Sequence, residues 1–182
     1  MPSRRASILA IAATCCCIVA SISCDFPPSE GAWRQIQRSG FSFEIPGEPQ
    51  FKDDTMAAGP YTLPVEDINW WRGQEQFSIK AIDFTPMPNA LKVDPKALLD
   101  SFIRGGLRTT GGTATSDRSI VVCGAPAREM VADITIPYPA RMFTRMIWAS
   151  PRAYLVSYNC PNSIAESPDG RKFIDSFQLT TK

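Results

Sequence analysis

Histidine, the side chain that most often moves protons near neutral pH, does not occur among the 182 residues of this chain. Its absence excludes Ser-His-Asp and Cys-His catalytic centres, and any metal site that depends on imidazole ligands. Chemistry based on carboxylates, lysine, tyrosine or cysteine remains open, but no cluster of these residues stands out in the sequence. We therefore predict no catalytic residue, no metal ligand and no cofactor, and we expect a protein that is not an enzyme.

The strongest candidate for a binding surface is the sequence Trp70-Trp71-Arg72. Adjacent residues of a β-strand point to opposite faces, so at most one of the two indoles can lie deep in the same core. An exposed tryptophan beside the Arg72 guanidinium would form a contact surface for a partner. The alternative is that both indoles cover the sheet beneath loops or helices, because tryptophan is usually mostly buried.

Two arginines and two cysteines could also carry chemistry. Arg141 and Arg145 share one face of a predicted strand, where they could bind an anion or, as is more usual, form ion pairs with carboxylates. Cys123 and Cys160 lie at opposite ends of predicted strands, about 25 Å apart at the rise of an extended chain. A disulfide needs Cα atoms within about 7 Å, so we predict none.

Composition narrows the class of protein. The chain is 44% hydrophobic, which allows a complete core, and its length fits one domain preceded by a leader. The formal net charge is +1, without the basic excess that a nucleic-acid surface normally shows. We expect no nucleic-acid partner.

Residues 1–23 have the form of a signal peptide. Arg4 and Arg5 supply the positive start, Ala6–Val19 supplies the apolar segment, and small residues lead to Cys24. The sequence Ser21-Ile22-Ser23-Cys24 resembles a bacterial lipoprotein processing box, in which the cysteine is lipidated, although the first position is usually leucine. In this interpretation residues 24–32 form a lipidated tether, and Cys24 anchors the protein to a membrane.

Two other interpretations of the leader remain open, an uncleaved signal anchor and plain secretion. For the signal anchor, the stretch Ala6–Ser23 has 18 residues, which is at the short end of what spans a bilayer. Cys15, Cys16 and Cys17 are weaker candidates for the lipidated residue. All three interpretations place the domain outside the cytoplasm, in the cell envelope if the anchor is kept.

The stretch Ala127–Cys160 predicts three antiparallel strands that organise the rest of the chain. Prolines mark the two connections, Pro137–Ala140 and Ser150-Pro151, because proline cannot donate to a strand ladder. If these connections close hairpins, Met130 faces Ile147 and Phe143 faces Tyr158. One face of this sheet is then apolar and the other half apolar, so both need cover, and helices are the expected cover.

The remaining segments supply further strands and the helices. Asp94 and Pro95 are typical of a helix start, and Gly111-Gly112 of a helix end. The polar segment Phe51–Pro60 is expected to be a loop. The other predicted elements are hairpins over Trp33–Ile45 and Tyr61–Phe84, a strand at Arg118–Cys123 and a last helix from Ser167.

Four segments resemble one protein family. They are Phe41–Pro49, the helix that ends at Gly111-Gly112, Gly124–Glu129 and Ser167–Phe177. Together, over about residues 33–179, they are similar to the small bacterial envelope proteins of the PsbP-like and DcrB-like group. The resemblance implies an α+β domain over 33–182, an α/β/α sandwich with helices on both faces of an antiparallel sheet. It also implies a non-enzymatic role without a common site, so no residue role is carried over.

These features predict an envelope lipoprotein that is lipid-anchored to a membrane and binds or assembles with an unknown envelope protein. The alternative is a carrier that holds a small ligand or lipid in a pocket between sheet and helix. A third possibility is a hydrolase that uses carboxylates alone. It would need two facing, partly buried acids with raised pKa values in a cleft.

Overall fold

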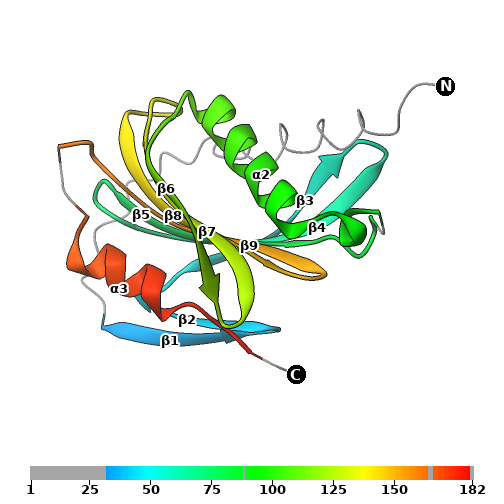
Figure 1. Ribbon diagram of the computed structural model, residues 1–182. Helices are drawn as coiled ribbons and strands as arrows, with labels where there is room; N and C mark the ends of the chain where they lie inside the picture. The colour runs from blue at the N-terminus through cyan, green and yellow to red at the C-terminus, as the bar shows by residue number, and fades with distance from the viewer. Residues whose placement is uncertain (1–31, 88, 164–165, 181–182) are drawn as a thin grey trace.

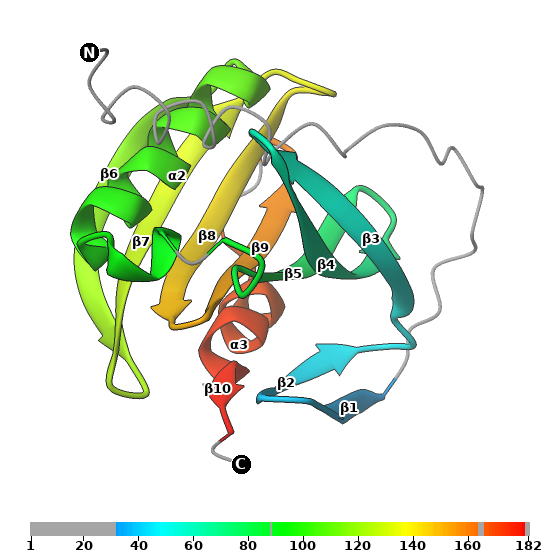
Figure 2. The ribbon, with the colours of Figure 1, turned by 90° about the vertical axis from the view of Figure 1, so that its right-hand side faces the viewer.

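Antiparallel strands dominate the structure, a computed structural model that describes residues 32–87, 89–163 and 166–180. Of these residues, 57% lie in strands and 19% in helices. Within these ranges the larger sheet has seven strands in the order β3-β4-β5-β9-β8-β7-β6 (Figures 1 and 2). Their bounds are β3 Gln50–Ala58, β4 Tyr61–Arg72, β5 Glu75–Asp83, β6 Thr113–Val122, β7 Ala125–Ile134, β8 Ala140–Ala149 and β9 Arg152–Cys160.

A smaller sheet, β1-β2-β10, and the helices pack around the larger sheet. Helix α2 contacts β7 and β8, whereas the short helix α3 contacts β2 and β9 (Figure 1). The two helices belong to different hydrophobic cores, and α3 shares its core with β2 of the smaller sheet. The bounds are β1 Trp33–Arg38, β2 Phe41–Pro46, η2 Ala90–Lys92, α2 Pro95–Thr110, α3 Pro168–Ser176 and β10 Gln178–Leu179.

Local sequence fixes both ends of α2, as predicted. The Asp94 carboxylate accepts hydrogen bonds from the backbone N–H groups of Lys96 and Ala97, and Pro95 occupies the first turn. Gly111 ends the helix in the left-handed conformation, at φ 58°, which glycine adopts without the penalty of a Cβ atom. These caps place the apolar side of α2 over β7 and β8.

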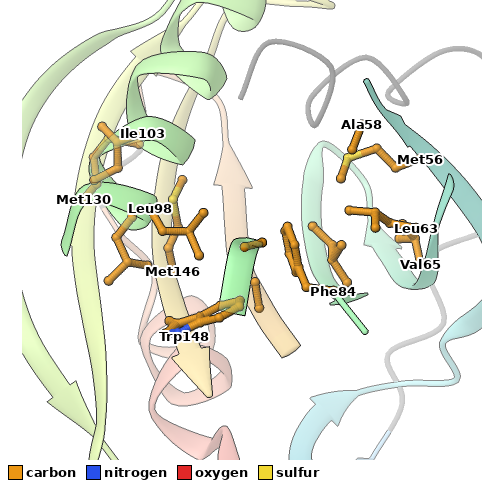
Figure 3. Close-up of a cluster of buried hydrophobic side chains, with 14 of the residues drawn as sticks. Met56, Ala58, Leu63, Val65, Phe84, Leu98, Ile103, Met130, Met146 and Trp148 are labelled. Atoms are coloured by element: carbon orange, nitrogen blue, oxygen red, sulfur yellow. The ribbon is translucent and has the colours of Figure 1, made fainter. Parts of the chain in front are cut away.

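Each face of the larger sheet has its own core. The core on the α2 face is rich in methionine and also contains Phe84 and Trp148, and Figure 3 shows Leu98, Ile103 and Met146 on one side of Phe84. The opposite core is aromatic, and it contains Phe43, Phe77, Tyr158 and Phe173. Phe173 of α3 meets the rings of both Phe43 and Phe77 edge-on, an arrangement that aromatic pairs favour.

The prediction of an α/β/α sandwich is wrong, because helices do not flank the sheet on both faces. Opposite α2, the larger sheet packs against β2 of the smaller sheet, with the nine-residue α3 beside it. The reason lies in β2, where the alternating residues Phe41, Phe43 and Ile45 all join the aromatic core. Strand β2 therefore covers this face of the larger sheet, where the predicted sandwich had a helix. The fold is mostly antiparallel β.

The predicted register between β7 and β8 is also wrong. Met130 faces Thr144, three positions from the predicted partner Ile147. Because side chains alternate with a period of two, an odd shift moves every residue of β7 to the other face. Met130 therefore packs in the α2 core instead of the aromatic core.

The end of α2 causes this shift in register. The backbone N–H groups of Thr135 and Ile136 both donate to the carbonyl oxygen of Thr110, each over 3.0 Å. The chain thus leaves the strand ladder directly after Ile134, earlier than the prolines indicate. The next hairpin turns at Ser150-Pro151 as predicted, and its predicted register is confirmed, with Phe143 facing Tyr158.

The polar segment that was expected to be a loop forms the edge strand β3, so this expectation is wrong. Met56 and Ala58 turn into the α2 core, whereas Lys52 and Asp53 stay exposed. Charged side chains are typical of edge strands, where they oppose pairing with another chain. The hairpins β1-β2 and β4-β5 form where they were predicted.

Ion pairs and hydrogen bonds connect α3 to the larger sheet. The Glu129 carboxylate of β7 accepts hydrogen bonds from Arg118 of β6, from Arg145 of β8 over 2.6 Å, and from Arg171 of α3 over 3.3 Å. Arg145 also donates to the carbonyl oxygen of Ile174 in α3. Burial alone would raise the pKa of Glu129, but hydrogen bonds from Arg118 and Arg145 outweigh it and hold this pKa below its ordinary value.

Replacing Glu129 with Gln tests this attachment. We expect the free energy of unfolding at pH 7 to fall by about 2 kcal/mol, because three guanidinium groups lose their shared charged acceptor. A carboxyl with a lowered pKa stabilises the fold above its ordinary value of 4.5, and this contribution is lost as pH falls through the lowered pKa. Urea unfolding between pH 3 and pH 7 should therefore show a weaker acid dependence for Glu129→Gln than for wild type. An equal acid dependence would contradict the assignment, and Asp53→Asn at the exposed edge is the control.

Candidate binding site

Eight polar side chains lie together on the α2 face of the larger sheet, at positions where a packed core would place apolar ones. They share this face with Val65 and Ile82, which belong to the α2 core. Five of the eight are buried, each at most 9% exposed. We call the group the polar floor, and its members are Asp67, Asn69, Gln76, Ser78, Lys80, Thr144, Ser157 and Asn159.

The strand register places the polar floor in three cross-strand rows. The floor lies mainly on the central strands β4, β5 and β9, and Thr144 is its one member on β8, which α2 contacts. The first row is Trp71, Gln76, Asn159 and Met142; the second is Asn69, Ser78, Ser157 and Thr144; the third is Asp67, Lys80, Leu155 and Met146.

Hydrogen bonds join five floor residues into a directed ladder. Asn159 Nδ2 donates to Gln76 Oε1 over 2.9 Å, and Gln76 Nε2 donates to Asn69 Oδ1 over 3.0 Å. Asn69 Nδ2 then donates to Asp67 Oδ1 over 2.7 Å, and the Lys80 ammonium donates to Asp67 Oδ2 over 2.8 Å. All the amide donors point the same way, so the ladder ends on a carboxylate and begins with the acceptor Asn159 Oδ1.

That first acceptor has no partner. Asn159 Oδ1 is buried, and it accepts no hydrogen bond. By contrast, the hydroxyl groups of Thr144 and Ser157 bond to each other over 2.8 Å. An unpaired buried acceptor costs about 1–3 kcal/mol, so this oxygen marks a place where a bound donor would be favourable.

Two aromatic rings stand at the end of the first row. Trp71 is 39% exposed, and its ring lies 6.3 Å from that of Tyr138, a half-buried residue of the loop between β7 and β8. Burial raises the pKa of Tyr138 to about 12, so its phenol is neutral at physiological pH. We call Trp71 and Tyr138 the aromatic rim.

Apolar residues flank the strands that carry the polar floor. Figure 3 shows Met56, Leu63 and Val65 on the side of β3 and β4, and Met130 and Met146 on the side of β7 and β8. A cavity of about 30 Å³ lies between α2 and the sheet, with room for about one or two water molecules. No residue of the polar floor lines this cavity.

The floor and the rim, together, form the candidate site.

The two predicted tryptophans lie on opposite faces, as the sequence indicated. Trp70 is 5% exposed and packs in the aromatic core with its ring 5.1 Å from that of Phe77. Gly47 lies so close that a Cβ atom there would be 2.3 Å from Trp70 Nε1. Trp70 therefore contributes to the core, and Trp71 is the tryptophan of the pair that a partner could contact.

Arg72 lies on the face opposite Trp71, so the predicted surface of Trp70, Trp71 and Arg72 does not form as one patch. The guanidinium of Arg72 pairs with Glu75 over 2.7 Å and with Asp169 of α3 over 2.5 Å. Glu75 also accepts a hydrogen bond from the Tyr158 hydroxyl. These contacts hold the start of α3 against the β4-β5 hairpin.

The other sequence candidates have structural roles. Arg141 pairs with Asp133 over 2.8 Å, and Arg145 joins the Glu129 network, so ion pairs replace the alternative of an anion site. Cys123 is exposed and Cys160 is buried, and no disulfide joins them. In residues 32–87, 89–163 and 166–180, no cluster of three or more Cys, Asp or Glu side chains could hold a metal ion.

The leader and Cys24 lie outside the described residues. Within the part of the chain that the structure does describe, no helix is long and apolar enough to cross a membrane.

Comparisons with known proteins leave the family of the chain open. No family model matches the sequence, and no curated protein matches it. The chain matches the crystal structure of PA94 from Pseudomonas aeruginosa, a protein of unknown function, with 13% identity and a TM-score of 0.41. The match covers 73% of this chain and 85% of that one, and at this score it carries no argument about function.

Sequence reasoning missed most of the polar floor, although one signal was present. Asp67, Asn69 and Trp71 alternate along β4, and Gln76, Ser78 and Lys80 alternate along β5, so each strand carries a polar face. Only the pairing register of β4 and β5 shows that their polar sides lie on the same face of the sheet. Tyr138 and Asn159 come from distant segments, and no local pattern links them to Trp71.

The pair Asp67 and Lys80 offers a test of whether the floor serves stability. Asp67→Leu alone should lower the free energy of unfolding by about 3 kcal/mol, because it leaves the Lys80 ammonium without its carboxylate. Asp67→Leu combined with Lys80→Met should restore or exceed wild-type stability, since apolar residues of similar volume often replace such pairs without loss. Chemical denaturation measures both. A double variant as unstable as the single one would show that the polar floor is structural.

Proposed function

We propose that this protein is a binding module, not an enzyme, that is tethered to a membrane of the cell envelope and recognises its partner with the polar floor and the aromatic rim. The observation that carries the proposal is the polar floor itself. Asn159 Oδ1 in the floor is buried without a hydrogen-bond partner, and such a group costs stability. Convergent polar groups beside aromatic rings are typical of recognition sites.

The chemistry of the floor supports binding over catalysis. Asp67 is its one carboxylate, and this group is engaged with Lys80 and Asn69. A hydrolase based on carboxylates would need a second facing acid, and a proton donor would need a raised pKa. Glu129 has a lowered pKa and three arginine partners on the other face, so it does not meet that need.

The tether follows from the leader. Arg4 and Arg5, the apolar segment and Cys24 support a lipoprotein anchor that holds the domain outside the cytoplasm. An envelope component is therefore the partner that the anchored domain would meet.

The alternative of a lipid carrier receives little support. The cavity between α2 and the sheet measures about 30 Å³, far less than an acyl chain occupies. Its lining is apolar and distinct from the floor. The residues that line it on α2 and the neighbouring strands include Ile82, Leu99, Phe102, Met146 and Leu155.

Photocrosslinking in living cells tests the proposed site. A photoreactive phenylalanine analogue at position 71 of the full-length protein should give a discrete crosslinked species. The same analogue at position 121 should not, because Val121 is 73% exposed but lies on β6, the opposite edge of the sheet. Equal crosslinking at the two positions, or none at position 71, would contradict the site.

Two further variants complete this experiment. Asn159→Leu in the protein labelled at position 71 should weaken the crosslink, because it removes the first amide of the ladder. Cys24→Ala should prevent incorporation of a labelled lipid precursor if Cys24 carries the anchor, and unchanged labelling would exclude this cysteine.

A further inference from the structure

We propose that the polar floor binds an uncharged glycan that contains N-acetylated sugars. This inference rests on the proposed function, because it names the class of ligand for the same site. Three features of the site indicate this ligand: the charge of the floor, the unpaired acceptor at the head of the ladder, and the aromatic rim.

The charge of the floor points to a neutral ligand. Its only charged groups are Asp67 and Lys80, which pair over 2.8 Å and cancel each other. The remaining members are three amides and three hydroxyl groups. A charged ligand would lie beside these groups without a free counter-ion, and an unpaired charge is costly to desolvate. An uncharged ligand that forms many hydrogen bonds meets no such penalty.

The ladder shows which donor the ligand must bring. Each amide donates its N–H to the next oxygen, from Asn159 to Gln76 and on to Asn69, and Asn159 Oδ1 at the head has no donor. An acetamide N–H placed there would extend the ladder by one further amide. Hydroxyl groups of a sugar would form hydrogen bonds with the amides and hydroxyl groups of the floor, because a hydroxyl group both donates and accepts.

The aromatic rim matches a sugar ring. A pyranose has an apolar C–H face and a polar edge, so it can lie against an aromatic ring while its hydroxyl groups reach polar side chains. Trp71 is 39% exposed and stands in the same cross-strand row as Gln76 and Asn159. The rim and the head of the ladder are therefore placed for one ligand.

A peptide fits this site less well. Extended peptides are usually recognised at a strand edge, where backbone groups are available. The strands that carry most of the floor, β4, β5 and β9, each have a hydrogen-bonded strand on both sides. The floor offers side chains only, and these are amides, hydroxyl groups and one ion pair.

Titration with triacetylchitotriose tests the proposal. The full-length protein in detergent micelles is titrated by calorimetry, and cellotriose serves as the matched sugar that lacks acetamide groups. We expect saturable binding of triacetylchitotriose and at least tenfold weaker binding of cellotriose. No binding of triacetylchitotriose at millimolar concentration, or equal affinity for both sugars, would overturn the proposal.

Variants locate the binding. Trp71→Ala and Asn159→Leu should each weaken the affinity for triacetylchitotriose at least tenfold, whereas Phe51→Ala, an exposed aromatic control on β3, should leave it unchanged. Ser78→Ala is a second floor variant that leaves the ladder intact, and it keeps the test informative if Asn159→Leu does not fold. Equal affinity of all these variants would place the binding elsewhere and contradict the inference.

The two proposals fail in different ways. A crosslink at position 71 that depends on Asn159, together with no binding of triacetylchitotriose, would retain the binding module and reject the glycan. If the crosslinked species is a protein, the ligand class is wrong and the site is right. If neither a crosslink at position 71 nor binding of triacetylchitotriose is observed, the site itself is rejected.

Discussion

The alternation of side chains along the central strands is the constraint on which this structure depends. Strands β4, β5 and β9 must serve an aromatic core on one face and a different environment on the other, and a single backbone register fixes both. On the aromatic face, Phe77 and Tyr158 pack with α3 and β2. On the α2 face, the same strands carry amides, hydroxyl groups and one ion pair. A change of register by one residue would exchange the two environments, so the site and the core are fixed together.

The distribution of helices explains why one face can hold a site. Helix α2 contacts β7 and β8, and all but one of the polar floor residues lie on β4, β5 and β9. The opposite face carries the smaller sheet and α3, and the Glu129 network and the Arg72 contacts hold α3 in place. The aromatic core therefore stabilises the sheet. The α2 face can then carry polar groups, although they lower the stability of the fold.

Local signals in the sequence were sufficient for most elements and insufficient for their arrangement. The cap at Asp94, the stop at Gly111 and the turn at Ser150-Pro151 each act within a few residues, and each prediction that rests on them is confirmed. The register of β7 depends on hydrogen bonds from Thr135 and Ile136 to Thr110, and no pattern in the strand itself indicates these bonds. The β layer formed by β2 was missed for the same reason, since a short apolar strand does not show what it packs against. The aromatic rim joins Trp71 to a residue 67 positions later, Tyr138, and only the fold brings them together.

Hydrogen–deuterium exchange on the protein in its native membranes tests the central claim most directly, that the floor and rim form the site where a partner binds. Exchange is compared between native membranes and the purified full-length protein in detergent. We predict slower exchange in native membranes for the segments 69–78 and 135–139, which carry the rim and the ladder residues Asn69 and Gln76, and no change in the edge strand 113–122. Protection confined to the edge strand, or identical exchange in both preparations, would contradict this account.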